Sequence, residues 1–299
     1  MTRARRRVLV TGGAGFIGSH IADAYLAAGD EVWIMDDLSS GRRENVPEAA
    51  HLVEMDIRSA EDVRNLFREA RFDLVNHHAA QIDVRVSVTD PAKDAAINVH
   101  GLLNLTEAAI EVGTRRFVFV SSGGVVYGEP ELIPTPESAP KGPLSPYGVT
   151  KLTGEHYLNY YRHVRGLDYV ALRYANVYGP RQDYKGAYIA VIMKILDRIY
   201  QGLPPIVYGD GSQAYDFIYV GDIARANICA LKCAAADAFY NVGRGIETSI
   251  AELCKLLIEL TGSDLQIQYE PAGQTFVTHR VGCPEKSKQE IGFEAQVGL

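Results

Sequence analysis

Long apolar runs are missing from this 299-residue sequence: no stretch approaches the ~18 consecutive apolar residues that a membrane-spanning helix requires. We therefore expect no membrane partner. The N-terminus is basic at residues 3–7, but the apolar run that follows, residues 8–10, is too short for the core of a signal peptide. We interpret the basic run as a solvated tail that leads into a first strand.

Basic residues and cysteines are scarce as well. The 30 lysines and arginines are outnumbered by 37 aspartates and glutamates, which gives a net charge of −7. A nucleic-acid partner is not expected, because phosphate backbones attract basic surfaces. The adjacent His77 and His78 have no carboxylate or cysteine at a suitable spacing, so we expect no metal site. We interpret the few cysteines as reduced thiols in a cytoplasmic protein; they are Cys229, Cys233, Cys254 and Cys283.

Strand and helix patterns alternate through the first half of the chain. This alternation predicts an α/β fold, a doubly wound parallel sheet with helices on both faces. We expect strands at residues 7–11, 31–35, 51–55, 73–77, 117–120 and 169–172, and helices at 16–28, 60–69, 91–112 and 146–165.

The alternation loosens after Arg173. Here we expect helices at residues 186–200, 222–233 and 250–260 and a short strand at 239–242. We interpret residues 1–174 as the main domain, with segments near 206–242 returning to it, and residues 175–299 mainly as a smaller, interleaved substrate-binding lobe. No composition shift marks a flexible linker, so the two parts should pack closely.

Three spaced glycines, Gly12, Gly15 and Gly18, join the first expected strand to the first helix. Gly12 permits a tight turn, Gly15 lets the backbone approach a pyrophosphate, and Gly18 lets the helix pack close to the strand. The N-terminus of the helix then presents free N–H groups to the phosphates. The pattern predicts a Rossmann-type dinucleotide-binding turn, because an acidic residue also ends the next strand.

That acidic residue is Asp36, which should accept hydrogen bonds from the adenosine ribose. Its carboxylate repels a 2′-phosphate and so favours NAD, although Arg42 and Arg43 nearby are able to hold such a phosphate. Asp56 and Ile57 follow the third strand, where they are placed to meet the adenine. The alternative for Asp56 is the N-cap of the next helix.

Tyr147 and Lys151 are four residues apart, so both side chains lie on one face of a helix. A tyrosine hydroxyl has an ordinary pKa of about 10, and service as a base near pH 7 requires a pKa about three units lower, or about 4 kcal/mol. A lysine ammonium and a positively charged nicotinamide ring act in that direction. The spacing alone is common by chance, and its value comes from the dinucleotide motif.

Together, these motifs resemble the extended short-chain dehydrogenase/reductase family, and within it the UDP-glucose 4-epimerase-like members of the NAD-dependent epimerases and dehydratases. The shared segments run nearly from end to end. They lie at residues 11–20, 35–41, 78–81, 98–101, 121–128, 145–151, 173–181 and 216–222.

The resemblance implies 4-epimerisation of a nucleotide sugar of the UDP-glucose/UDP-galactose type. Tyr147 takes the proton of the sugar 4′-hydroxyl while hydride moves to tightly held NAD⁺, and the 4-keto sugar turns over to receive the hydride on its other face. Lys151 supports the tyrosine. Ser122, whose counterpart lines the cofactor site, completes the expected catalytic set.

Binding residues and a homodimer are implied too. Asn176 corresponds to an asparagine that contacts the sugar-nucleotide phosphates, and Tyr208 to an aromatic ring near the base. Family members often pair through the helices expected at 91–112 and 146–165. The expected cofactor-binding set is Gly12, Gly15, Phe16, Ile17, Gly18, Asp36, Asp37, Ser40, Gly41, Asp56, Ile57, His78, Ala79, Ala80, Gln81, Asn98, Ser121, Ser122, Tyr147, Lys151, Tyr174 and Val177. The expected substrate-binding set is Val84, Gly123, Gly124, Asn176, Arg181, Val207, Tyr208, Tyr215 and Arg280.

The sequence departs from the family pattern in three places. Gly123 stands where a Ser or Thr hydroxyl usually helps the tyrosine, so proton transfer is direct or uses a water. Tyr215 stands where an arginine often binds the diphosphate, and Arg181 or Arg280 are the candidates to replace it. The alternative for each of these two arginines is a salt bridge. The sequence also stops at Gly298 and Leu299, where family members usually continue into a last amphipathic helix.

Three other functions compete with this one. A 4,6-dehydratase needs an Asp-Glu pair where this chain has Gly124 and Val125, so elimination is disfavoured. An epimerase for an acidic sugar such as UDP-glucuronate stays open, because Arg85 or Arg181 could pair with a sugar carboxylate. A non-catalytic NAD-binding protein is disfavoured by the retention of Tyr147 and Lys151.

Overall fold

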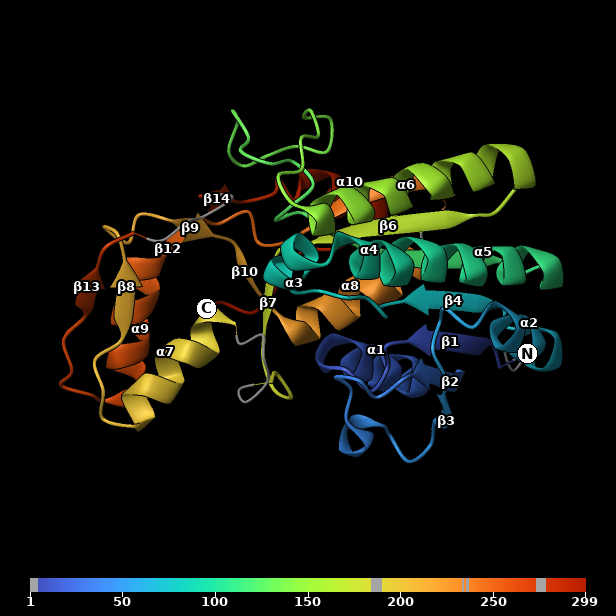
Figure 1. Cartoon of the computed structure of the whole chain (residues 1–299), viewed down its shortest axis with the longest axis horizontal. Helices are drawn as coiled ribbons and strands as arrows, with labels where there is room; N and C mark the ends of the chain where they lie inside the picture. The colour runs from blue at the N-terminus through green and yellow to red at the C-terminus, as the bar shows by residue number, and fades with distance from the viewer. Residues whose placement is uncertain (1–4, 184–189, 233, 235–236, 273–277) are drawn as a thin grey trace.

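A computed structural model describes residues 5–183, 190–232, 234, 237–272 and 278–299 of the chain. Its main feature is a sheet of seven strands in which every neighbouring pair is parallel (Figure 1). This confirms the predicted Rossmann-type doubly wound fold. In sheet order the strands are β11 (Asp237–Val242), β6 (Tyr169–Tyr174), β5 (Arg116–Ser122), β4 (Leu74–His77), β1 (Arg7–Thr11), β2 (Glu31–Asp36) and β3 (His51–Glu54).

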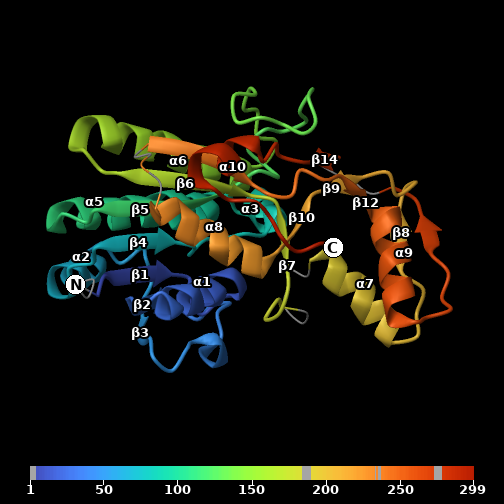
Figure 2. The same ribbon diagram turned by 180° about the vertical axis from the view of Figure 1, so that it is seen from behind.

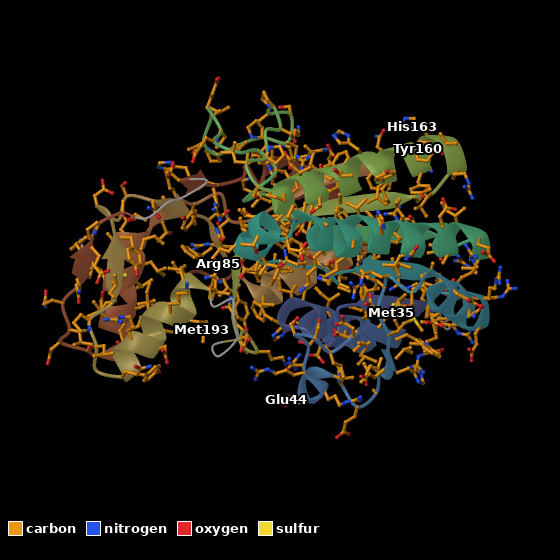
Figure 3. All side chains as sticks on the ribbon, in the orientation of Figure 1. Met35, Glu44, Arg85, Tyr160, His163 and Met193 are labelled. Carbon is orange, nitrogen blue, oxygen red and sulfur yellow. The ribbon has the colours of Figure 1, made fainter. Side chains whose placement is uncertain are left out.

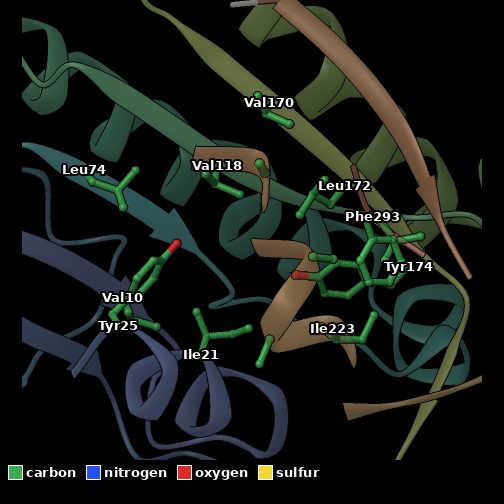
Figure 4. Close-up of a cluster of buried hydrophobic side chains, with 14 of the residues drawn as sticks. Val10, Ile21, Tyr25, Leu74, Val118, Val170, Leu172, Tyr174, Ile223 and Phe293 are labelled. Carbon is green, nitrogen blue, oxygen red and sulfur yellow. The ribbon is translucent and has the colours of Figure 1, made fainter. Parts of the chain in front are cut away.

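Helices cover both faces of this sheet because its strands are apolar on both sides. Val8 and Val10 of β1 pack on one face, and Leu9 packs on the other. Figure 4 shows the first of these cores, to which β1 contributes Val10, α1 contributes Ile21 and α8 contributes Ile223. The helices of that face are α1 (Phe16–Ala27), α8 (Val220–Lys232) and α10 (Glu285–Ile291), and those of the opposite face are α2 (Ala60–Ala70), α5 (Gly101–Val112) and α6 (Pro146–Arg165).

The limits of α6 agree with the prediction because its ends are marked in the sequence. The Ser145 side chain accepts a hydrogen bond from the Gly148 N–H, Pro146 occupies the first helical position, and Gly166 ends the helix in the left-handed conformation. This helix carries Tyr147 and Lys151, so the capping residues determine which turns of the helix hold these two side chains.

Two expected helices differ from the structure. The segment 91–112 is divided into α4 (Pro91–Ala95), a π-helical turn (Ala96–His100) and α5, and a short α3 (Val84–Thr89) precedes it. The helix expected at 186–200 begins at Val191 as α7 (Val191–Tyr200), while residues 186–189 lie outside the described residues. A short 3-10 helix (Arg43–Asn45) follows β2.

A second group of short elements forms the smaller lobe (Figure 2). Its core joins α7 to α9 (Ile250–Thr261), with Val207 and Phe217 between them. The chain leaves the lobe to form α8 and β11, returns for α9, and leaves again for α10. The strands outside the large sheet are β7 (Asn176–Tyr178) with β10 (Phe217–Tyr219), β8 (Ile206–Tyr208) with β13 (Gln268–Glu270), and β9 (Ala214–Tyr215) between β12 (Thr248–Ser249) and β14 (His279–Arg280).

Two further features bear on the sequence predictions. Among the described helices, none combines the length and apolar character that crossing a membrane requires. The last residues of the chain are held against α8, because the Asp222 carboxylate accepts hydrogen bonds from the backbone N–H groups of Gln296 and Val297, both at 2.9 Å.

Candidate active site

The turn between β1 and α1 contains two glycines, Gly12 and Gly18, at which a side chain would clash with the backbone. Gly12 has φ +68°, and a Cβ there would lie 2.7 Å from the backbone nitrogen of Ala79. A Cβ on Gly18 would lie 2.2 Å from the carbonyl oxygen of Gly12. The chain therefore folds tightly back on itself, and α1 starts in contact with the turn.

The N-terminus of α1 has the properties of an anion site. Within the described chain, its N-cap Gly15 makes no side-chain capping bond, and the first turn carries no acidic residue. The N–H groups of Phe16, Ile17 and Gly18 belong to this turn, where a helix leaves donors without helical partners. The residues present therefore fit a dinucleotide pyrophosphate.

Asp36 lies at the end of β2 beside this turn. Its buried carboxylate accepts hydrogen bonds from the backbone of Ala14 (3.0 Å) and Leu38 (2.9 Å), and burial raises its pKa above the ordinary value. Gly41 closes over it, since a Cβ there would lie 2.6 Å from the Asp36 Oδ1 atom. Two backbone donors use only part of the capacity of a carboxylate, and the remaining lone pairs can accept from ribose hydroxyls.

The loop after β2 shows what its charged residues do. Asp37 accepts hydrogen bonds from the backbone and hydroxyl of Ser39, and Ser40 is exposed beside it. Arg42 pairs with Asp183 at 2.7 Å. Arg43 pairs with Glu54. Both arginines that could have held a 2′-phosphate are thus engaged with carboxylates.

Asp56 and Ile57 follow β3. The Asp56 carboxylate accepts from the backbone and guanidinium of Arg58, which lowers its pKa. The N-cap of α2 is Ser59, three residues after Asp56, so the N-cap alternative for Asp56 was wrong. Ile57 is buried against Gly101, where a Cβ would lie 2.4 Å from it.

The loop after β4 begins at His78 and lies against the glycine turn. The Thr11 hydroxyl bonds the His77 Nδ1 atom (2.7 Å) and accepts from the Ala79 N–H (3.2 Å), so it fixes the loop that continues into Ala80. The His78 Nε2 atom is buried and has no hydrogen-bond partner among the described residues. Burial, with Lys151 nearby, lowers the His78 pKa to about 3. A neutral, orphaned imidazole beside the glycine turn fits a bound cofactor as its missing partner.

Tyr147 and Lys151 lie together as the spacing predicts. The Lys151 Nζ atom is 5.8 Å from the centroid of the Tyr147 ring and donates to the Val120 carbonyl at 2.9 Å. Lys151 is buried, and burial lowers its pKa to about 8, against the opposing charge of Asp94. Tyr147 is half-buried against a small apolar cluster that contains Val125.

The strand-end loop 121–124 lies beside the catalytic helix. The Ser121 hydroxyl donates to Glu155 of α6 at 2.6 Å. The Gly123 N–H donates to the Tyr174 carbonyl at 3.0 Å. Gly123 does not have a left-handed φ, and a Cβ there would meet the carbonyl oxygens of Arg173 and Tyr174 at 3.4 Å, an ordinary contact. The half-buried Ser122 precedes it.

A cavity of about 10 Å³ touches Gly123, Asp216 and Arg280. This is about the space that one water molecule requires. Burial raises the pKa of Asp216 to about 6. Water-sized space with polar walls therefore adjoins the position where the hydroxyl is missing.

The two candidate arginines are in different surroundings. Arg280 stacks on the Tyr215 ring, with 5.1 Å from its guanidinium carbon to the ring centroid, and its side chain would lie 3.2 Å from a Cβ on Gly124. Its buried Nε atom has no hydrogen-bond partner within the described part of the chain. Arg181 instead pairs with Asp23 of α1 at 2.7 Å, which is the salt bridge expected from the sequence as the alternative to diphosphate binding. Arg280, not Arg181, is therefore placed with the other predicted substrate residues.

The remaining predicted substrate residues lie on several elements. Asn176 begins β7, where its N–H donates to the Asp216 carbonyl at 2.9 Å, and Val177 follows it. Val84 begins α3. The Val207 side chain is fully buried in the small-lobe core, so a substrate contact there involves its backbone, whereas Tyr208 is exposed.

Several residues with structural roles at the site were missed from the sequence. Asp94 and Thr150 join the Gln81 loop to α6, and the buried pair Glu155–Arg173 holds α6 against β6. Two of these residues could have been found from their positions in the sequence. Glu155 follows Lys151 by four residues, which places it on the same face of the helix, and Thr150 is next to Lys151.

The fold and the site together define a dinucleotide-dependent enzyme with a Tyr–Lys pair. The chain belongs to the NAD dependent epimerase/dehydratase family, whose model matches residues 8–243. This confirms the resemblance to extended short-chain dehydrogenases/reductases and the prediction of NAD as cofactor.

Relatives in this family are similar over nearly their whole lengths. The UDP-glucose 4-epimerase of Mycolicibacterium smegmatis is 40% identical, over 98% of this chain and 95% of the relative. The structure of UDP-glucose 4-epimerase with UDP-glucose from Thermotoga maritima is 40% identical with a TM-score of 0.95, covering 98% of this chain and 94% of that one. The UDP-glucose 4-epimerase of Thermus thermophilus, solved as a complex with NAD, is 42% identical with a TM-score of 0.91, covering 98% and 95%.

Proposed function

We propose that this chain interconverts UDP-glucose and UDP-galactose by NAD-dependent 4-epimerisation. The observation that carries the proposal is the convergence of the glycine turn, Asp36 and the Tyr147–Lys151 pair at the carboxyl edge of one parallel sheet. The similarity to UDP-glucose 4-epimerases over 98% of the chain supports the choice of substrate.

NAD⁺, when bound, supplies a hydride acceptor that returns the hydride in the same turnover. Gly15, the first turn of α1 and Asp36 would hold its pyrophosphate and adenosine ribose. Tyr147 would take the proton of the sugar 4′-hydroxyl and give it back after the 4-keto sugar has turned over. Lys151 would favour the deprotonated tyrosine through its positive charge.

Substrate recognition follows from the loops around Gly123. Arg280 would bind the diphosphate, since its orphaned buried Nε atom and its stacking on Tyr215 leave donors directed into this region. Asn176 and Tyr208 would contribute the phosphate and base contacts. The cavity beside Gly123 would hold a water in place of the hydroxyl that other family members have.

The competing enzyme functions differ at identified positions. A 4,6-dehydratase needs an acid and a base beside the nicotinamide, and Gly124 and Val125 provide neither. An acidic sugar needs a cation for its carboxylate, and Arg181 is paired with Asp23. Arg85 pairs with Asp83 and lies at the end of α3 that faces the smaller lobe (Figure 3).

The test is incubation of the purified protein with a panel of UDP- and TDP-sugars, followed by NMR detection of 4-epimers. We expect UDP-galactose and UDP-glucose to interconvert in wild-type protein and not with Tyr147→Phe. Turnover confined to UDP-glucuronate would overturn the substrate, and a 4-keto-6-deoxy product would overturn the reaction. Denatured protein should also release NAD.

We also propose a homodimer that is paired through α5 and α6. Val149, Tyr157, Tyr160 and Val164 form an exposed apolar stripe on α6, since their spacing places them on one side of the helix. Tyr160 and His163 project from α6 at the outer edge of the molecule (Figure 3). Light scattering should give twice 32.8 kDa.

Replacing Tyr160 and Val164 by Glu should yield the monomer mass, whereas Tyr200→Glu, an exposed control on the smaller lobe, should not. A wild-type monomer at micromolar concentration would contradict the dimer.

We further propose a cytoplasmic location, supported by the free thiols of Cys229, Cys254 and Cys283. Fractionation of the producing cells tests this location.

A further inference from the structure

A fully buried carboxylate, Asp94, lies behind the catalytic helix. Its Oδ1 atom accepts from the Gln81 side chain (2.8 Å) and the Asn98 side chain (3.1 Å), and its Oδ2 atom accepts from the Thr150 hydroxyl (2.7 Å). These donors come from three separate segments of the chain. Among the described residues Asp94 has no hydrogen-bonded arginine or lysine, and a carboxylate of this kind is costly to bury, so such a well-supplied site calls for a function.

The π-helical turn makes this arrangement possible. Asn98 lies in that turn, four residues after Asp94. The Asn98 Oδ1 atom accepts from the Gln81 N–H (2.9 Å), and its Nδ2 atom donates to the Gln81 carbonyl (3.0 Å). The side-chain amide thus satisfies both backbone groups of Gln81, as a neighbouring strand would. Single π turns within helices often occur at functional sites. Here the turn ties the loop of His78–Gln81 to Asp94.

Asp94 also contacts the helix that carries Tyr147 and Lys151. Thr150 lies between Tyr147 and Lys151 in the first turns of α6, so its bond to Asp94 fixes the helix that carries both. Asp94 is the source of the charge that opposes the lowering of the Lys151 pKa by burial. The Asp94 carboxylate therefore contacts α6 through Thr150, and its negative charge favours the protonated form of Lys151.

Other titratable groups lie around Asp94 and Lys151. Burial, together with the charge of Lys151, lowers the pKa of His77 at the end of β4 and of His78 just after it, so both are neutral. At the start of α3, which packs on α4, Asp83 and Arg85 pair with each other. On α6, Glu155 pairs with Arg173, and Tyr147 is the proposed base.

We propose that Asp94 is a positioning residue for the reaction: through Thr150 and Gln81 it holds α6 against the cofactor loop, and its negative charge keeps Lys151 protonated. This inference rests on the proposed function, in which Lys151 supports Tyr147 as a cation. Asp94 touches neither substrate nor cofactor in this scheme. It acts through the lysine and through the helix.

The first experiment measures the protonation of Lys151 directly. NMR of protein with ¹³C-labelled lysine side chains gives the Lys151 titration, assigned with Lys151→Arg. Asp94→Asn should lower that pKa by on the order of one unit relative to wild type, as expected for the loss of a nearby buried charge. Asp222→Asn, which removes another buried carboxylate, should leave it unchanged.

The second experiment measures kcat against pH. In Asp94→Asn the alkaline limb, where Lys151 loses its proton, should move to lower pH in parallel with the NMR titration. Thr150→Val keeps the charge and removes the bond to the helix, so it should lower kcat about tenfold or more without moving this limb. Thr150→Ser should restore kcat.

An unchanged Lys151 titration in folded Asp94→Asn would overturn the electrostatic part, and full activity of Thr150→Val would overturn the positioning part. If Asp94→Asn does not fold, the two Thr150 variants decide the positioning part alone. An inactive wild type with the expected NMR titration would overturn the proposed function instead, so the two failures are distinguishable.

Discussion

Placing a serine at position 123 tests whether a water substitutes for the missing hydroxyl. The backbone of Gly123 is not left-handed, and the new Cβ would meet two carbonyl oxygens at 3.4 Å, so the residue should enter without strain. Removing a glycine from the unfolded chain typically stabilises a protein by about 0.4–1 kcal/mol. We therefore expect a melting temperature within a few degrees of wild type.

The effect on the rate follows from one hydrogen bond. If the serine hydroxyl takes the place of a water in the adjoining cavity of about 10 Å³, one bond is exchanged for another. A net hydrogen bond contributes about 1 kcal/mol, which corresponds to a roughly fivefold change in rate. Gly123→Ser should therefore change kcat/KM by less than about tenfold in either direction.

The assay couples UDP-galactose turnover to an NAD-linked UDP-glucose dehydrogenase, with thermal unfolding measured in parallel. Gly123→Ala is the matched control, because it adds the same Cβ without a hydroxyl. Gly123→Ala should be slower than Gly123→Ser if the new methyl group displaces the water, because the methyl group cannot make the hydrogen bond that the water made. A loss of more than a hundredfold in Gly123→Ser, or a fall of more than about ten degrees in melting temperature, would refute the reasoning.

Three further predictions concern the cofactor turn and the base. Tyr147→Phe should reduce kcat by roughly 10²–10⁴-fold while leaving NAD binding within about threefold, and activity above half of wild type would exclude Tyr147 as the base. Asp36→Ala should weaken NAD binding by about 10–100-fold in calorimetry on cofactor-free protein, since a bond to a charged group contributes about 1.5–3 kcal/mol; a wild-type preference for NADP would contradict the interpretation. Gly18→Ala, whose Cβ would lie 2.2 Å from a backbone oxygen, should destabilise the fold by about 1–3 kcal/mol or more in urea unfolding, whereas Gly298→Ala, with open space around it, should not.

The large sheet could be predicted from the sequence because its inner strands β1, β4 and β6 carry apolar residues that are buried on both faces. The glycine turn and the ends of α6 were equally clear, since Gly12 and Ser145 each have a single local role. These are properties of a few neighbouring residues. The order of the strands in the sheet depends on contacts between distant segments, and no local pattern specifies it.

The same reason explains what was missed at the site. Arg181 and Arg280 look alike as residues, and their positions in space separate them: one pairs with Asp23 and the other stacks on Tyr215. The expected helix at 91–112 hides a π turn, because its apolar spacing is that of an ordinary helix. Asp94 has no sequence signal, since its three donors lie at positions 81, 98 and 150.

The buried polar groups behind α6 are better explained by the reaction than by stability. Asp94 and the Glu155–Arg173 pair must be desolvated on folding, and apolar residues of similar size often stabilise a protein as well or better. Their hydrogen bonds satisfy the buried atoms but leave little net gain. What they provide is orientation: Asp94 acts on the turn that carries Tyr147 and Lys151, and Glu155 joins the next turn to Ser121 and to Arg173 of β6. Because both carboxylates act on the same helix, folded variants changed at either position should show altered geometry of the tyrosine and lysine, measured as a fall in kcat at unchanged NAD binding.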